Sequence, residues 1–193
     1  FIAGIAHPYQ LDLCDEIGLM VYEETLAGWC LADSPQMAER FDFSVREMIL
    51  RDRNHPSAAI WGLLNETPDG PVFRHAVDML KLVRELDDSR LVLLGSGRWD
   101  KQFTIGSLCN PGSTAWECEW GVDSPSYTPG SEPNVGSFGG YMNGAGDAHV
   151  YPGMPLTQAV EDAIRIIGKG TKPVFLSEYG IGSLMNGIRE LRH

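Results

Sequence analysis

The stretch Ala58-Ala59-Ile60-Trp61-Gly62-Leu63-Leu64-Asn65-Glu66 decides how the rest of the chain is interpreted. Its part from Ala58 to Leu64 is almost continuously apolar, which is typical of a strand buried on both faces of a parallel sheet. An amide and a carboxylate then follow at the carboxyl end of this strand. In open α/β sheets and in (β/α)₈ barrels, the functional site forms at that end of the strands. Taken alone, Asn-Glu-Thr-Pro-Asp-Gly would also suit an ordinary turn.

The composition is that of one globular domain. The chain has 193 residues, of which 43% are hydrophobic and 21% are charged, and it has no apolar run long enough for a membrane-spanning helix. The formal net charge of −11 argues against nucleic acid or an anionic membrane as a partner, because both attract a basic surface. The four cysteines lack the C-x-x-C spacing of a zinc site. Cys109 and Cys118 could pair in an oxidising compartment, although free thiols are the expectation, and the sequence indicates no localisation.

Strand-like apolar runs alternate with helical patterns along the chain. The expected strands are 1–6, 19–22, 58–64, 91–94, 148–151 and 173–176, and the expected helices are 9–17, 36–53, 72–86 and 156–168. This alternation predicts right-handed β-α-β units, a parallel sheet and a single domain over 1–193. Between about 95 and 146 the pattern gives way to Gly, Pro, Ser, Asn and aromatic residues. A stretch of this length without regular structure predicts a functional, active-site loop.

Polar residues stand at the carboxyl ends of the expected strands: His7, Glu24, Asn65, Glu66, His149, Tyr151 and Glu178. In a closed barrel these ends surround one pocket, whereas a doubly wound sheet would place most of them on opposite sides. We therefore expect an α/β protein with a (β/α)₈ TIM barrel. Two carboxylates across its mouth, Glu66 and Glu178, suit glycoside hydrolysis, in which one protonates the leaving oxygen and the other attacks or stabilises the anomeric carbon.

Two neighbouring features are expected to be structural. Glu23 is expected to be a solvated strand-end carboxylate that faces away from Glu24, because adjacent strand residues point to opposite faces. Asp52, Arg53 and His55 are expected to form a hydrogen-bonded knot between a helix and the following strand.

Several motifs resemble the catalytic barrel of glycoside hydrolase family 2, which includes β-galactosidases, β-glucuronidases and β-mannosidases. They are His7-Pro8, the stretch 11–24, Arg51-Asp52-Arg53-Asn54-His55-Pro56-Ser57, Ile60-Trp61-Gly62, Asn65-Glu66 and Ser177-Glu178-Tyr179-Gly180. The Arg-Asp-Arg-Asn-His-Pro-Ser block with a downstream Asn-Glu is the most specific of them. One departure is Gly4, which stands where the family commonly has an Arg three residues before the His.

The resemblance implies a retaining exo-β-glycosidase that acts by double displacement through a glycosyl-enzyme. Glu66 would be the general acid/base and Glu178 the nucleophile. Asn65 would bond the sugar 2-hydroxyl, and Glu24 would bind substrate or, in some members, a cation. The expected substrate-binding set is completed by His7, His149, Tyr151, Trp99 and Tyr179. No cofactor and no metal are expected.

The resemblance also implies a longer parent chain. A full barrel usually takes about 250 residues, so this chain is expected to hold about six of the eight β/α units. The parent chain would supply the missing units and accessory β-sandwich domains. The sequence does not decide whether the protein forms a homo-oligomer. The fragment alone is expected to be inactive or poorly folded, because unclosed strands leave unpaired edges.

Two other functions stay open on the sequence. A non-catalytic carbohydrate-binding barrel would keep the aromatic loop without turnover, although the presence of both carboxylates with their motifs argues against it. A metal-dependent barrel hydrolase would use His7, Glu24 and His149, and metal analysis would distinguish that case.

Overall fold

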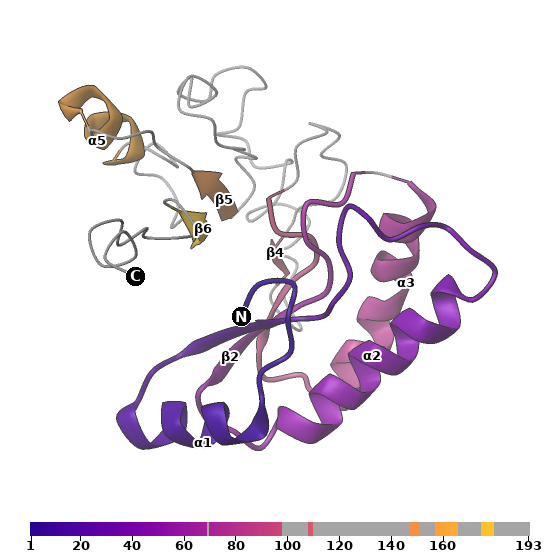
Figure 1. Cartoon of the computed structure of the whole chain (residues 1–193). Coiled ribbons are helices and arrows are strands. Elements are labelled where there is room, and N and C mark those ends of the chain that lie inside the picture. The colour runs from indigo at the N-terminus through magenta and orange to yellow at the C-terminus, as the bar shows by residue number, and fades with distance from the viewer. Residues whose placement is uncertain (69, 98–107, 110–146, 151–156, 166–174, 180–193) are drawn as a thin grey trace, which may run out of the picture.

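The computed structural model describes residues 1–68, 70–97, 108–109, 147–150, 157–165 and 175–179 (Figure 1). In chain order its elements are α1 (Pro8–Ile17), β1 (Val21–Glu24), α2 (Met37–Asp52), β2 (Ala58–Gly62), α3 (Pro71–Leu86), β3 (Leu91–Leu93), β4 (Leu108–Cys109), β5 (Asp147–Val150), α5 (Gln158–Arg165) and β6 (Phe175–Tyr179). The predicted alternation of strands and helices is confirmed from α1 to β3, and Gly18, the C-cap of α1, adopts the left-handed conformation. Within these ranges no helix is both long and apolar enough to cross a membrane.

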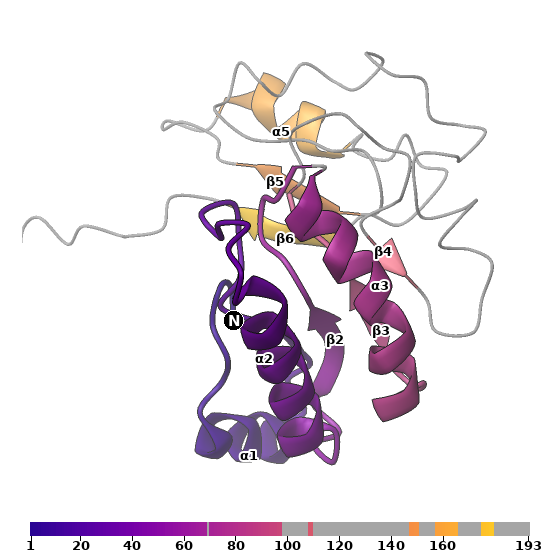
Figure 2. The ribbon, with the colours of Figure 1, turned by 90° about the vertical axis from the view of Figure 1, so that its right-hand side faces the viewer.

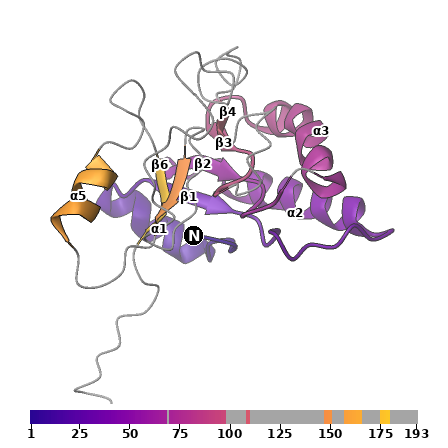
Figure 3. The ribbon, with the colours of Figure 1, turned by 90° about the horizontal axis from the view of Figure 1, so that it is seen from above.

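The strands form two sheets. Strands β1, β2 and β3 are parallel neighbours, β4 joins β3 in the antiparallel direction, and β5 pairs with β6 in parallel. Seen from above, β5 and β6 lie beside β1 (Figure 3), and the rings of Tyr22 and Phe175 join the two sheets with centroids 5.6 Å apart. The parallel pairings agree with the predicted β-α-β units. In the described part of the chain the strands do not close into a barrel.

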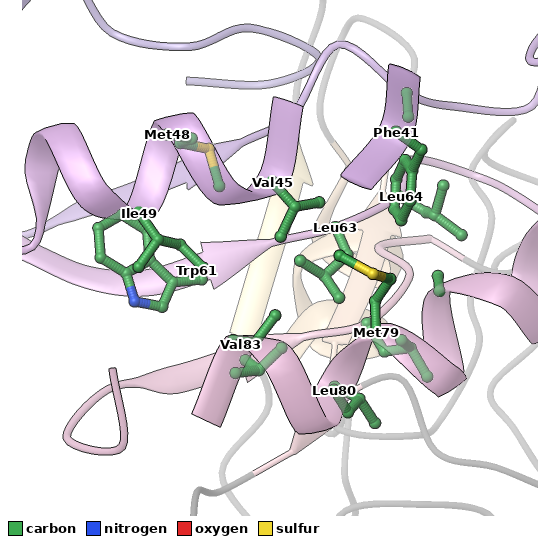
Figure 4. Close-up of a cluster of buried hydrophobic side chains, with 14 of the residues drawn as sticks. Phe41, Val45, Met48, Ile49, Trp61, Leu63, Leu64, Met79, Leu80 and Val83 are labelled. Atoms are coloured by element: carbon green, nitrogen blue, oxygen red, sulfur yellow. The ribbon is translucent and has the colours of Figure 1, made fainter. Parts of the chain in front are cut away.

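Helices α2 and α3 lie side by side (Figure 2) and cover one face of the first sheet. The apolar stripe of each helix packs on β2 and its extension, and the buried cluster includes Phe41, Val45, Met48, Ile49, Trp61, Leu63, Leu64, Met79, Leu80 and Val83 (Figure 4). Trp61 is wholly buried, and its Nε1 donates a hydrogen bond of 2.9 Å to Asp87 Oδ2. A buried indole N–H requires such a partner, so this contact fixes β2 against the end of α3.

Of the knot predicted from Asp52, Arg53 and His55, the contacts of Asp52 and His55 are confirmed, with additional members. Arg53 instead donates to the Leu86 carbonyl at the end of α3. Arg51 donates to both carboxylate oxygens of Asp52, at 2.7 and 2.6 Å. His55 Nδ1 lies 2.7 Å from Asp15 Oδ2, and the Ser57 amide donates to Asp15 Oδ1. The hydrogen bond from Ser57 is the main cause that lowers the pKa of Asp15 below its usual range. Burial opposes this shift, and the bond to His55 adds to it. The knot therefore joins α1, α2 and the start of β2.

The strand expected at 1–6 is not formed. Ala3 has φ 44°, which interrupts the extended backbone that a strand requires. The amides of this segment instead bond to side chains of β1, since Ala3 N donates to Glu24 Oε2 and Ala6 N to Glu23 Oε1. Carboxylates of β1 thus satisfy donors that a neighbouring strand would otherwise satisfy.

One further prediction on the secondary structure is corrected by β4, and two others fall mostly or partly outside the described residues. β4 lies inside the stretch expected to lack regular structure, and it runs antiparallel to β3, which the alternating pattern did not predict. Most of the predicted 95–146 loop and the ends of the predicted 156–168 helix lie outside the described residues.

Candidate active site

The segment after β2 is held between two other chain segments, and this positions Asn65 and Glu66. The Asn65 amide donates to the Ala27 carbonyl at 3.0 Å, and the Glu66 amide donates to the Ser96 carbonyl at 2.7 Å. On the same side, the Ser96 amide donates to the Leu64 carbonyl at 2.8 Å. Parallel pairing therefore continues past the end of β2, so both side chains leave from a fixed backbone rather than from a free turn.

The Asn65 side chain bridges the two sheets. Its Nδ2 donates to Glu178 Oε1 at 2.8 Å and to Ser96 Oγ at 3.2 Å. The side chain is buried, and its two N–H donors are directed to groups on β6 and on the segment after β3. The end of β2 is thereby linked to a carboxylate 113 residues further along the chain.

His149 of β5 lies between the two carboxylates. Its Nδ1 is 2.9 Å from Glu66 Oε1, and its Nε2 is 3.6 Å from Glu178 Oε1. The His149 side chain is 0% exposed, whereas each carboxylate is 16% exposed. The two acids therefore meet at one buried imidazole and keep a narrow access to solvent.

These three side chains could hold a metal ion, since one donor atom from each lies within 4.8 Å of the others. Each carboxylate, however, faces a different nitrogen of the ring. A metal ion would be ligated by a single ring nitrogen. The arrangement therefore resembles a histidine that bridges two acids more than a histidine that shares a metal with them.

The backbone at Glu66 is in a conformation that is rare for its residue type. Its φ is 47°, in the left-handed region, which costs a residue other than glycine about 1–3 kcal/mol and persists where the surroundings enforce it. The contact that enforces it is the hydrogen bond from the Glu66 backbone amide to the Ser96 carbonyl. Residues held in such conformations cluster at functional sites.

Gly97 makes room for the imidazole. It has φ 61°, and a Cβ added there would lie 2.2 Å from His149 Nδ1. No side chain can occupy that space while the ring stays where it is. The absence of a side chain at Gly97 thus allows the ring to approach the backbone after β3.

Glu24 lies beneath the site and is wholly buried. Its Oε1 accepts hydrogen bonds from Ser96 Oγ at 2.9 Å and from the Tyr22 hydroxyl. Burial is the main cause that raises the pKa of Glu24, and the bonds from Tyr22, Ala3 and Ser96 oppose it. Glu24 supports Ser96, and through Ser96 it supports Asn65, rather than presenting a surface to a ligand.

Gly62 allows the ring of Tyr22 to reach Glu24. A Cβ at Gly62 would lie 2.5 Å from a ring carbon of Tyr22, so the ring crosses β2 at the point where β2 has no side chain. The Trp-Gly pair of the sequence motif therefore combines a buried anchor with a passage for the tyrosine.

Glu23 was expected to be solvated, and this expectation is wrong. Glu23 faces away from the Glu24 side chain as predicted, but it is 0% exposed. It accepts the Ala6 amide at 2.8 Å, and Arg51 Nη2 lies 3.6 Å away. Burial, with the charge of Asp52, raises the pKa of Glu23 to about 7. The burial arises because the end of α2 and the segment before α1 cover this face of β1.

The structure thus brings together five of the residues that the sequence selected: Glu24, Asn65, Glu66, His149 and Glu178. His7 lies elsewhere, exposed at the start of α1, where its amide donates to Gln10 Oε1 and its ring contacts Tyr9. The His7, Glu24 and His149 set of the metal-hydrolase alternative is therefore not assembled. Tyr179 is the last residue of β6 and is 76% exposed. Trp99 and Tyr151 lie outside the described residues.

Sequence reasoning missed Ser96 and Gly97, which contact Asn65 and His149 respectively. Both follow the apolar run 91–94, so the rule that selected Asn65 and Glu66 would have found them. A small hydroxyl and a glycine carry no obvious chemistry, so their residue types alone do not indicate a role.

Parallel strands alternating with helices, with two acidic side chains gathered at the strand ends, define an α/β domain with a paired-carboxylate site. Residues 6–190 match the family described as "Glycosyl hydrolases family 2, TIM barrel domain". The chain belongs to this family.

Related proteins cover part of the chain. The beta-galactosidase of Thermoanaerobacterium thermosulfurigenes is 40% identical over 81 residues, which are 42% of this chain and 11% of that protein. The beta-galactosidase of Thermoanaerobacter pseudethanolicus is 42% identical over 81 residues, or 42% of this chain and 10% of that protein. A crystal structure of Parabacteroides merdae beta-glucuronidase is 28% identical, with a TM-score of 0.39, and the match covers 42% of this chain and 11% of that one. The matched part of the chain spans about a tenth of each relative.

Proposed function

We propose that this chain carries the active site of a retaining exo-β-glycosidase, which hydrolyses O-glycosidic bonds of carbohydrates by double displacement. The observation that supports this best is the meeting of Glu66 and Glu178, from different strands, at one histidine, with donor atoms of all three within 4.8 Å. Retaining glycosidases hold their carboxyl groups about 5–5.5 Å apart, whereas inverting enzymes need about 6.5–9.5 Å to admit a water molecule. The short spacing favours direct attack by one carboxylate.

In the first step a carboxylate oxygen of Glu178 bonds to the anomeric carbon while the bond from that carbon to the leaving oxygen breaks. Glu66 gives its proton to the leaving oxygen, so no free alkoxide forms. In the second step Glu66, now ionised, removes a proton from water as the water oxygen bonds to the anomeric carbon. The ester to Glu178 breaks, and both side chains return to their first states.

Asn65 would orient both the nucleophile and the sugar. Its two N–H groups are directed to Glu178 and Ser96, which leaves its carbonyl oxygen as the acceptor for the sugar 2-hydroxyl. A bond to that hydroxyl strengthens in the oxocarbenium-like transition state. The amide would therefore couple the position of the sugar to the position of the attacking carboxylate.

The substrate would be a β-galactoside or a β-glucuronide, since the relatives include a beta-galactosidase and a beta-glucuronidase. The complete barrel, of which this chain would hold about six of eight β/α units, would be finished by further residues of a longer protein together with accessory β-sandwich domains. Trp99 and Tyr151 remain proposed members of the sugar site.

The experiment is a panel of aryl β-glycosides, including the galactoside and the glucuronide, assayed on the full-length enzyme. Glu178→Gln should abolish turnover of every substrate. Glu66→Gln should abolish turnover of alkyl glycosides but spare part of the first step for a dinitrophenyl glycoside, whose leaving group needs no proton. Glu47→Gln on the exposed face of α2 is the matched control and should behave as wild type. Wild-type turnover in both site variants would rule out the assignment.

A further inference from the structure

His149 has a geometry that contact with a sugar does not explain. It is wholly buried, and each of its two ring nitrogens faces a different carboxylate. We propose that His149 is a positioning residue that shares the proton of Glu66 and couples it to the charge on Glu178. This inference rests on the proposed function, because it assigns His149 a part in the same two-step reaction.

The strand pairing is built to place the ring at this point. Asp147 pairs with Phe175 and Ala148 with Leu176, but His149 pairs with Glu178, so Ser177 is an extra residue on β6. A β-bulge of this kind re-aims the side chains that follow it. Because paired residues of neighbouring strands point to the same face, the bulge brings the imidazole and the Glu178 carboxylate to one side of the sheet.

The segment after β3 fixes the ring from the opposite direction. A Cβ on Gly97 would meet Nδ1 at 2.2 Å, Cε1 at 2.3 Å and Cγ at 2.6 Å, so the ring lies directly over this backbone. Glu66, on the Nδ1 side, is itself held by the hydrogen bond from its backbone amide to the Ser96 carbonyl. The imidazole is therefore confined by β5, by Gly97 and by the two acids.

Such confinement allows two placements of the same protons. In one, Glu66 carries the acidic proton and donates it to Nδ1, while the N–H on Nε2 faces the ionised Glu178. In the other, the proton has moved to Nδ1, and an imidazolium lies between two carboxylates. The net charge is equal in both, so the proton can move between Glu66 and Nδ1 without a change in the charge of the site.

The reaction would alter this balance. When Glu178 becomes an ester in the glycosyl-enzyme, the anion opposite Nε2 disappears and the imidazolium loses one of its two partners. The proton that Glu66 takes from water in the second step then belongs on Glu66 until the Glu178 anion returns. Among the described residues the ionisable groups facing the ring are Glu66 and Glu178, with Glu24 behind Ser96.

Two substitutions separate the halves of this bridge. In His149→Asn the side-chain amide nitrogen takes the place of Nδ1, so it reaches Glu66 but not Glu178. In His149→Gln the side-chain amide nitrogen takes the place of Nε2, so it reaches Glu178 instead. Neither amide titrates. In the full-length enzyme we expect both variants to lower kcat/KM for an alkyl β-glycoside about 10- to 100-fold, which is at or below the lower end of the roughly 100- to 10,000-fold that proton transfer contributes. A dinitrophenyl glycoside should lose less than about threefold in its first step, and the alkaline limb of the pH profile should move to lower pH.

Equal losses for both leaving groups, with an unchanged pH profile and a raised KM, would overturn the inference and leave His149 as a sugar contact. Loss of activity on chelation that is restored by Zn²⁺ would also overturn it, because a metal would then occupy the three side chains. If both variants fail to fold, the wild-type enzyme provides the test. The ¹⁵N chemical shifts of the His149 imidazole are measured before and after Glu178 is trapped with a 2-fluoro glycoside. Unchanged shifts would contradict the coupling. Failure of the proposed function itself would appear separately, as turnover in Glu178→Gln.

Discussion

Asn65 Nδ2 donates a 2.8 Å hydrogen bond to Glu178 Oε1, and this bond joins the end of β2 to β6 across 113 residues. Because the same amide also reaches Ser96, the position of the proposed nucleophile depends on the ends of three strands. The site is therefore a property of the tertiary fold, and single contacts within it can be tested.

Asn65→Asp should inactivate the enzyme more than Asn65→Ala. The aspartate keeps the shape of the amide but replaces a donor with a second anion beside Glu178, whereas alanine only removes the donor. Loss of one preorganised donor costs about 100- to 1,000-fold in kcat, and we expect the alanine variant in that range. The exposed Asn54→Ala is the control. Steady-state kinetics with an aryl β-glycoside measure the effect, and near-normal kcat in the aspartate variant would contradict it.

Gly97→Ala should displace the His149 imidazole. The added Cβ would overlap the ring, and the left-handed backbone further disfavours alanine. We expect a loss of at least about tenfold in kcat and a Tm lowered by a few degrees, as for about 1 kcal/mol of strain. Gly70→Ala is the matched control, since its Cβ would meet nothing within 4 Å. Equal behaviour of the two variants would show that the ring does not lie over Gly97.

Ser96→Ala should weaken the support beneath the site. The hydroxyl donates to Glu24 Oε1 and accepts from Asn65, so its removal leaves a buried carboxyl with one donor fewer. Loss of a partner by a buried polar group costs about 1–3 kcal/mol, which urea unfolding would measure. A decrease in kcat should accompany it, because Asn65 loses one of its two anchors. The control is Ser44→Ala, since the Ser44 hydroxyl donates to the Arg40 carbonyl within α2. This variant should leave kcat unchanged, and an equal loss in both variants would contradict this account.

The sequence is sufficient to predict those residues of the site that carry a carboxylate, an amide or an imidazole at the end of a parallel strand. Asn65, Glu66 and Glu178 were found because a polar residue after a buried apolar run marks the carboxyl end of a strand. Ser96 and Gly97 were not found, since their roles depend on shape and on a hydroxyl with two partners rather than on ionisable chemistry.

The remaining differences have tertiary causes. Glu23 is buried because Ala6 and the end of α2 cover it, and no pattern within β1 shows that. The segment 1–6 is as apolar as a strand, yet its amides bond to carboxylates of β1. The bulge at Ser177, which sets the register of His149, likewise depends on how two distant strands pair.

Glu23 should make the barrel domain less stable as the pH rises from about 5 to 8. Burial and the charge of Asp52 raise its pKa to about 7 in the folded state, above the ordinary value of about 4.3 in the unfolded chain. Between these two values the folded state binds more protons than the unfolded state, so the free energy of unfolding falls as pH rises and stays low above the folded pKa. The change can reach at most about 4 kcal/mol, at 1.36 kcal/mol for each unit between the two pKa values.

Glu23→Gln should remove this dependence. The amide keeps an acceptor for Ala6 N without the charge that Asp52 opposes, so the variant should be more stable than wild type at pH 8 and similar at pH 5. Calorimetry of the barrel transition in the full-length protein at both pH values measures the difference, and the exposed Glu16→Gln on α1 is the control. If Glu23→Gln instead lowers Tm at pH 8, the interaction of ionised Glu23 with Arg51, 3.6 Å away, outweighs the cost of its burial, and the direction of the pKa shift is wrong.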